Sequence, residues 1–276
     1  MKIAGFLLLL GGTVWSVRLL DLDFWSLRPV PLVINLLVFA PLVLMVAAVT
    51  LRQTAAALGR QIPLRRAVAI VAHANVAELL PIPGGALVRG AALVQAGATM
   101  GDATRMVVIT AVLTLSLSVA CSALAFVWLG QPIGWLLVAG GGASAAVSAV
   151  LIWRKAGLWL TTGIVAIRFV TIGLSTVAVW LSFSALAHPA SLVEAALLVV
   201  SATLGTAVSI VPAGLGINEA IAAGLARLVA IDAAAAFLAV ALNRVVGLAA
   251  GAALVAMLGM TGSDKLQAEG GGSPRG

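Results

Sequence analysis

A few ionisable side chains lie inside stretches that are otherwise almost entirely apolar, and they are the residues that could do chemistry. Glu78 and Arg89 flank one break that is rich in proline and glycine. Glu219 follows a second such break, and Arg168 and Arg244 lie in separate apolar runs. A charge at membrane depth is expensive, so we expect each of these side chains either to bind a ligand or to pair with another.

The first break could bind an anion. Gly84 and Gly85 precede an apolar stretch with helical character, and the first turn of a helix presents unpaired N–H groups and a positive dipole end. Arg89 follows about one to two turns later, and the guanidinium fork matches the geometry of a phosphate. The residue types around this break therefore favour a phosphate group as the ligand.

The second break offers groups of the opposite sign. Asn218 and Glu219 follow Gly214 and Gly216 after one intervening residue, Ile217. An amide oxygen and a carboxylate accept hydrogen bonds, which suits a cationic or hydroxylated headgroup. We predict that the residues at both breaks line one substrate-binding site.

Two interpretations of these charged residues stay open. In the functional one, Arg89, alone or together with Arg244, binds a lipid phosphate while Glu219 faces the rest of the headgroup. In the structural interpretation, Glu78–Arg89 or Glu219–Arg244 are buried ion pairs that hold the hairpins in place. Glu78 and Glu219 are also the acidic residues in these stretches that could carry a proton.

Composition places these residues in a membrane protein. Of 276 residues, 62% are hydrophobic and 9% are charged, whereas a water-soluble domain has roughly a quarter charged residues. The net charge of +7 comes from Arg and Lys in short connections between apolar runs, which is typical of topology determinants and not of nucleic-acid binding. Two histidines and one cysteine are too few for a His/Cys metal site. We expect no cofactor and no enzymatic centre.

The apolar runs predict an all-α polytopic membrane protein with about six full spans of roughly 20 residues each. Two further stretches, 66–98 and 192–229, are interrupted at 81–85 and 212–216. Proline removes a backbone donor and glycine permits a turn, so each stretch should fold back as a re-entrant hairpin. Such a break survives at membrane depth only where it is buried in protein or lines a cavity. The predicted spans are residues 3–18, 31–51, 106–129, 133–152, 159–187 and 234–259.

The two interrupted stretches correspond to each other. When Pro83 is aligned with Pro212 and one extra residue is allowed, Arg89 falls on Glu219. Each copy then contains two helices, a broken hairpin and a long helix. Three full spans per copy is an odd number, so the copies should insert in opposite orientations, as in alternating-access transporters.

We therefore expect one transmembrane domain over residues 1–260, with repeats at about 1–129 and 133–259, and a disordered cytoplasmic tail over 261–276. The connections on one side carry most of the Arg and Lys, which predicts that both termini lie in the cytoplasm of a bacterial inner membrane.

The residues around both breaks resemble a known family. Residues 79–85 with Arg89, then 212–216 with Glu219, and Arg244 downstream, are similar to the flippase-like family, also called the lysylphosphatidylglycerol synthase transmembrane region. The resemblance implies a helical bundle with two re-entrant hairpins that moves an aminoacylated phospholipid or another lipid-linked headgroup across the bilayer. In the synthases a separate C-terminal soluble domain transfers the amino acid, and we expect this chain to lack it.

Three functional hypotheses follow. The first is a transporter that moves such a lipid between leaflets. The second is an accessory subunit that binds membrane lipids with an anionic or aminoacylated headgroup and delivers them to a partner biosynthetic enzyme. The third, a membrane-embedded transferase or hydrolase, is disfavoured because no polar catalytic cluster is apparent. The sequence does not indicate an oligomeric state.

Overall fold

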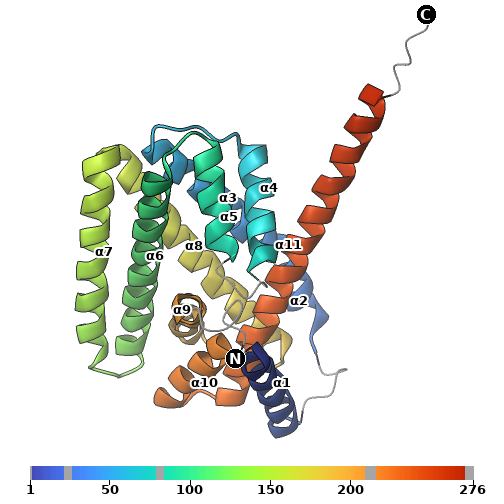
Figure 1. The fold of residues 1–276 in the computed structure, drawn as a ribbon. Coiled ribbons are helices and arrows are strands. Elements are labelled where there is room, and N and C mark those ends of the chain that lie inside the picture. The colour runs from blue at the N-terminus through green and yellow to red at the C-terminus, as the bar shows by residue number, and fades with distance from the viewer. Residues whose placement is uncertain (1, 22–26, 79–83, 209–215, 271–276) are drawn as a thin grey trace, which may run out of the picture.

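The computed structural model describes residues 2–21, 27–78, 84–208 and 216–270, and within these ranges every regular element is helical (Figure 1). The predicted all-α class is confirmed for this part of the chain. In chain order the elements are α1 (Lys2–Leu19), α2 (Pro29–Ile34), the π-helix η2 (Asn35–Phe39), α3 (Ala40–Ala57), α4 (Leu64–Ala77), α5 (Gly84–Gln95), α6 (Met100–Trp128), α7 (Gly134–Ala156), α8 (Leu158–Ala185), α9 (Leu192–Val208), α10 (Ile217–Leu228) and α11 (Ala233–Gly270).

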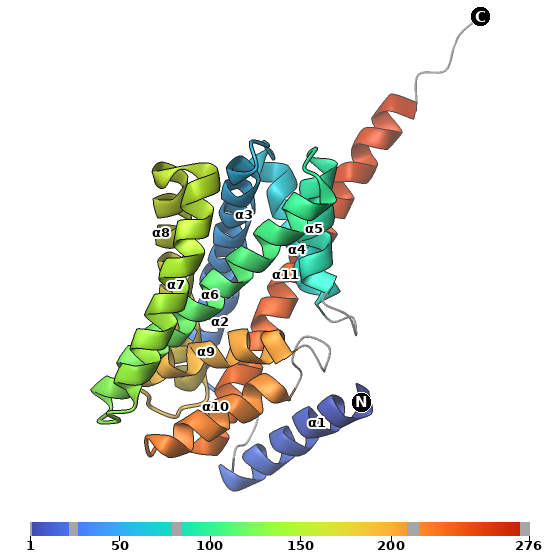
Figure 2. The same cartoon turned by 60° about the vertical axis from the view of Figure 1, so that its left-hand side comes forward.

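Five helical stretches among the described residues are long and apolar enough to cross a membrane, which indicates a multi-pass membrane protein. They match five of the six predicted spans, which end at most two residues beyond them. The sixth, residues 3–18, forms α1, which is not among the five, so the predicted number of spans is not reproduced. Figure 2 shows α1 lying beside α10 at the lower end of the bundle. The five stretches are Pro29–Ala57, Met100–Trp128, Gly134–Ala156, Leu158–Ala185 and Ala233–Leu258.

The junctions of α4 with α5 and of α9 with α10 lie at the two predicted interruptions, but Gly84 and Gly85, predicted as part of the break 81–85, already belong to the first turn of α5. Residues 78–83 separate α4 from α5, and residues 209–216 separate α9 from α10. In each case the two arms contact one another, so each stretch folds back on itself. We call α4–α5 the first hairpin and α9–α10 the second hairpin. Residues 79–83 and 209–215, including Gly214, lie outside the described part of the chain.

Local chemistry explains where several helices begin. Thr99 Oγ1 accepts a hydrogen bond from the Asp102 N–H at 3.1 Å at the start of α6, and Ser191 Oγ accepts one from the Glu194 N–H at 3.2 Å at the start of α9. In both, a side-chain oxygen satisfies an N–H that the helix itself cannot. Gly157 separates α7 from α8 with φ +83°, a left-handed conformation that favours glycine.

The helices of the two halves make corresponding contacts. The first helix of each half packs on the last helix of the other, since α1 contacts α11 and α7 contacts α6. The first arm of each hairpin also packs on the last helix of the other half: α4 contacts α11, and α9 contacts α6. Helix α3 contacts α8 where the halves meet. The division into two repeats near residue 130 stays a prediction. Opposite insertion of the halves is defined relative to a membrane and stays a prediction.

The core consists mainly of two buried apolar clusters, and α11 runs from one to the other. Its segment from Phe237 to Val240 belongs to the first cluster, which also contains Phe183 of α8. Val246, farther along α11, belongs to the second cluster. Asn243 and Arg244 lie between these two segments, so the polar residues of α11 stand at the boundary of the two clusters.

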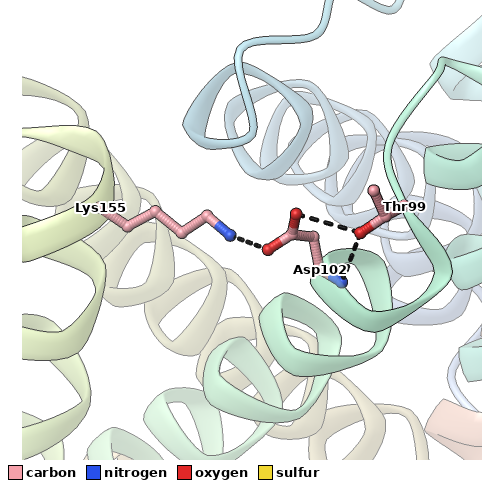
Figure 3. A network of polar contacts seen from close by, with 3 residues as sticks. All are labelled: Thr99, Asp102 and Lys155. Carbon is pink, nitrogen blue, oxygen red and sulfur yellow. Dashed lines mark hydrogen bonds and ion pairs between the residues drawn. The ribbon is translucent and has the colours of Figure 1, made fainter.

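One end of the bundle carries polar contacts between helix ends. Lys155, near the end of α7, forms an ion pair with Asp102 at the start of α6, and Thr99 Oγ1 donates a further hydrogen bond to Asp102 at 3.1 Å (Figure 3). Arg66 Nη2 donates to Gln95 Oε1 at 3.2 Å across the open end of the first hairpin. The connections rich in arginine that predict the cytoplasmic side are at this end. Helix α1 lies at the opposite end of the bundle (Figure 1). The arginine-rich end therefore does not include the N-terminus, and a cytoplasmic N-terminus stays a prediction.

The last helix is longer than the predicted span 234–259. Helix α11 continues to Gly270, into the stretch from 261 that we expected to be a disordered tail. Lys265, Leu266, Gln267 and Ala268 are good helix formers, which is a reason for the helix to continue. Residues 271–276 lie outside the described part of the chain.

Candidate functional site

Glu219 is paired with Arg244 in the interior. Gly216, with φ +77°, precedes α10 and places Glu219 in its first turn, where a negative charge is favoured. Arg244 Nη1 donates to Glu219 Oε1 at 2.8 Å, and the two side chains are 14% and 0% exposed. Within the described residues, Glu219 Oε2 is buried without a hydrogen-bond partner. The pair joins the second hairpin to α11.

Asn218 is buried beside this pair. Its Oδ1 also lacks a partner among the described residues. The side chain lies against Gly205 of α9, where an added Cβ would come within 1.6 Å of Asn218 Oδ1. Gly205 therefore lets the two arms of the second hairpin approach each other around Asn218. No local feature of the sequence distinguished this glycine from the many others in the chain.

Glu78 and Arg89 form the second pair at a hairpin. Arg89 Nη2 donates to Glu78 Oε1 at 3.2 Å, and the two side chains are 40% and 37% exposed. Gly84 and Gly85 are buried at the start of α5. A Cβ on Gly84 would lie 2.2 Å from the Ala77 carbonyl oxygen, and one on Gly85 would lie 2.6 Å from Glu78 Oε1. These glycines allow α5 to begin against the end of α4, so they have a packing role whether or not they bind an anion.

Both ion pairs of the structural interpretation are thus formed, but they differ. Glu219–Arg244 is buried, as the structural interpretation expects. Glu78–Arg89 is formed yet partly exposed, and Glu78 lies at the end of α4, beside the tip of the first hairpin. Neither observation tests whether these residues bind a lipid, so their roles as ligands stay predictions.

Asn35 was not predicted as a site residue. It is 1% exposed and begins the π-helical segment η2, a type of helix that often marks functional sites. Its Nδ2 lies 3.1 Å from the Ala178 carbonyl oxygen, 3.2 Å from Ser182 Oγ and 3.3 Å from Asn243 Oδ1. The network therefore links η2, α8 and α11, one residue away from Arg244. A single asparagine in an apolar run was the available signal, since such residues often bond to a neighbouring helix.

Arg168 faces the interior from α8. Ile164 and Ile172, one turn before and one turn after it, are both buried, so Arg168 lies on the side of the helix that faces the core. Its Nε is buried and has no hydrogen-bond partner in the described part of the chain. Arg168 therefore places a buried donor that the described residues do not satisfy on the core-facing side of α8.

A groove of about 460 Å³ runs between α7 and α8. It contains no ionisable side chain, so it cannot neutralise a charged headgroup, although its apolar wall suits an acyl chain. The lining residues are Ala149, Val150, Trp153, Leu158, Thr161, Thr162, Val165, Ala166 and Phe169.

The fold and these contacts define an α-helical, multi-pass membrane protein with ionisable side chains at two hairpins. In the ranges that the structure describes, no group of three His, Cys, Asp or Glu side chains could hold a metal ion. Comparisons with protein-family models, curated proteins and solved structures find no match to this chain. Its function must therefore be argued from its own residues.

Proposed function

We propose that this protein moves a phospholipid or another lipid-linked headgroup between the leaflets of a bacterial inner membrane. The observation that carries the proposal is the presence of an ion pair at each hairpin of an otherwise apolar bundle, one pair buried and the other half-exposed. Charges inside a membrane protein typically mark the path of a polar substrate.

In this proposal the two hairpins are re-entrant and enter the bilayer from opposite sides, as parts of an inverted repeat. The corresponding contacts of α4 with α11 and of α9 with α6 support this arrangement. In an inverted repeat the two halves exchange conformations during transport, so the side that is open alternates. The unequal exposure of the two ion pairs fits one such state, with the first hairpin open and the second closed.

The signs of the charges favour an aminoacylated phospholipid as cargo. Such a lipid carries a phosphate and an ammonium group. Arg89 matches the phosphate through its guanidinium fork, and Glu219 matches the ammonium through its carboxylate. A transporter of this kind needs no catalytic residue, because no covalent bond changes.

Leaflet exchange in vesicles tests the proposal. Purified protein is reconstituted into vesicles that contain a fluorescent lysyl-phosphatidylglycerol, and the fraction of label accessible to an external quencher is followed over time. We expect the wild-type protein to accelerate exchange and Arg89→Ala to abolish the acceleration while the protein stays folded. Arg227→Ala, an exposed arginine at the end of α10, is the matched control and should exchange lipid normally.

Two results would contradict the proposal. Wild-type exchange at the rate of protein-free vesicles would favour an accessory lipid-binding subunit that delivers its lipid to a partner enzyme. Normal lipid exchange by Arg89→Ala would show that Arg89 does not bind the phosphate group.

A further inference from the structure

The groove between α7 and α8 has the length and the wall that suit a lipid acyl chain. Both helices are long and apolar enough to cross a membrane, and Figure 1 and Figure 2 show α7 at the edge of the bundle. The lining on α8 begins at Leu158 and ends at Phe169, eleven residues farther along the helix. At a rise of about 1.5 Å per residue these residues span about 16 Å, close to half of the roughly 30 Å hydrocarbon core. The groove is therefore about as deep as one leaflet of a bilayer.

Two threonines line the groove without making it polar. Thr161 Oγ1 donates to the Gly157 carbonyl oxygen at 2.9 Å, and Thr162 Oγ1 donates to the Trp159 carbonyl oxygen at 2.9 Å. Both hydroxyl groups thus donate to the backbone one turn earlier. The other lining residues are alanine, valine, leucine, phenylalanine and tryptophan, so the wall favours a hydrocarbon chain over a polar ligand.

A basic residue lies at the end of the groove nearest the connection between α7 and α8. Arg154 directly follows Trp153, which lines the groove, and lies one helical turn beyond Val150, another lining residue. Arg154 is exposed, whereas its neighbour Lys155 forms an ion pair with Asp102. The guanidinium fork matches a phosphate group. An apolar groove with an arginine at its mouth is complementary to a ligand with an anionic head and a hydrocarbon tail.

Exposed tryptophans indicate that this end of the groove lies at the membrane surface. Trp153, near the end of α7, is 51% exposed, and Trp159, at the start of α8, is 88% exposed. Tryptophan is enriched where the hydrocarbon core meets the headgroups. A phospholipid in the adjacent leaflet would therefore have its headgroup level with Arg154 while its acyl chain runs along the groove towards Phe169.

We propose that the groove between α7 and α8 binds one acyl chain of an anionic phospholipid from the surrounding membrane, with the phosphate group on Arg154. A headgroup without an ammonium group is favoured, because an ammonium would repel the guanidinium. The site contains none of the ion-paired residues of the two hairpins. It is therefore a second lipid site, separate from the proposed transport path, and it does not depend on the proposed function.

Photocrosslinking with lipids tests the site because it reports the position of the bound chain. Purified full-length protein is reconstituted into phosphatidylcholine vesicles that contain a trace of phosphatidylglycerol or phosphatidylcholine with a diazirine in the same acyl chain. Labelling within residues 149–169 is quantified by mass spectrometry after digestion. Competition with unlabelled phosphatidylglycerol gives an apparent Kd.

Four variants examine the two parts of the site. Arg154→Gln removes the charge, and its matched control is Arg65→Gln, which replaces an exposed arginine of α4 at the same end of the bundle. Ala166→Phe fills the groove, and its matched control is Ala146→Phe, at an exposed position of α7 that does not line the groove.

We expect phosphatidylglycerol to label residues 149–169 more strongly than phosphatidylcholine does in the wild type and in both controls. Arg154→Gln should weaken the apparent affinity for phosphatidylglycerol about fivefold, the effect of one basic residue beside an anionic headgroup, and leave phosphatidylcholine labelling unchanged. Ala166→Phe should lower labelling by both lipids. If Ala166→Phe does not fold, Ala149→Phe fills the same groove from α7.

Equal labelling by the two lipids in the wild type would overturn the proposal, because lipid that only surrounds the protein does not select a headgroup at one position. Unchanged phosphatidylglycerol affinity in Arg154→Gln would also overturn it. Background labelling of residues 149–169 in the wild type would overturn it as well and would indicate another occupant, such as a second copy of this chain. The measurement involves no leaflet exchange, so its result is independent of the proposed transport.

Discussion

Removing Arg244 should destabilise the protein strongly because it isolates Glu219. Arg244→Met deletes the donor that lies 2.8 Å from a carboxylate with 0% exposure, and Glu219 Oε2 has no partner among the described residues to compensate. Breaking a buried pair in this way costs about 3–5 kcal/mol. Glu219→Gln should cost less, about 1–3 kcal/mol, because Arg244 is 14% exposed and makes a further contact.

Unfolding by sodium dodecyl sulfate in mixed micelles measures these differences, with the fluorescence of the seven tryptophans as the signal. Arg227→Met, at the exposed end of α10, is the control and should change the free energy of unfolding by less than about 0.5 kcal/mol. If Arg244→Met is no more destabilising than Arg227→Met, the pair does not hold the second hairpin against α11.

The double variant Glu219→Leu with Arg244→Met separates the structural from the functional interpretation. Replacing a buried pair by apolar groups of similar size is often nearly neutral, so the double variant should be more stable than Arg244→Met alone. A double variant that regains stability and leaflet exchange would show that the pair is structural. One that regains stability but not exchange would show that the charges act in transport.

Two further predictions concern a close packing contact within the second hairpin and an ion pair at one end of the bundle. Gly205→Ala should destabilise the protein by about 1–3 kcal/mol, since its Cβ would meet Asn218 at 1.6 Å, whereas Gly224→Ala, with nothing within 4 Å, should be neutral or stabilise by up to about 1 kcal/mol. Lys155→Ala should cost less than about 1 kcal/mol, because its ion pair with Asp102 is exposed at the end of the bundle. The same unfolding measurement checks both, and a loss at Gly224 as large as that at Gly205 would contradict the packing argument.

Long apolar runs and clusters of proline and glycine were the parts of the fold that could be predicted. Five predicted spans fall in helical stretches that can cross a membrane, because each is an almost continuous apolar run of about the length a bilayer requires. The first predicted span, 3–18, is shorter than the roughly 20 residues of a typical span, so hydropathy alone could not decide the position of α1. The break at 212–216 falls between α9 and α10, whereas the break at 81–85 overlaps the start of α5, since Gly84 and Gly85 are its first two residues.

The parts of the site that were not predicted depend on residues far apart in the sequence. Asn35 bonds to partners 143, 147 and 208 residues away, and no local pattern indicates which helices will lie beside it. The same holds for Arg168, whose place on the core-facing side of α8 depends on which helices pack against that side. The sequence identified Glu78, Arg89, Glu219 and Arg244 because charge in an apolar run is a local property. It left open which of them would pair.

The two interpretations of these charges converge once the cost of breaking each pair is considered. In the proposed transport cycle the second hairpin must open, which separates Glu219 from Arg244, and an isolated buried carboxylate would make that step slow. A cargo with both an ammonium and a phosphate group removes the obstacle, because each separated charge keeps a partner of opposite sign. The half-exposed Glu78–Arg89 pair needs no such help. With Glu219–Arg244 buried and Glu78–Arg89 accessible, opening of the second hairpin would therefore depend on cargo. The Glu219–Arg244 ion pair that stabilises the closed state would also prevent movement without a lipid.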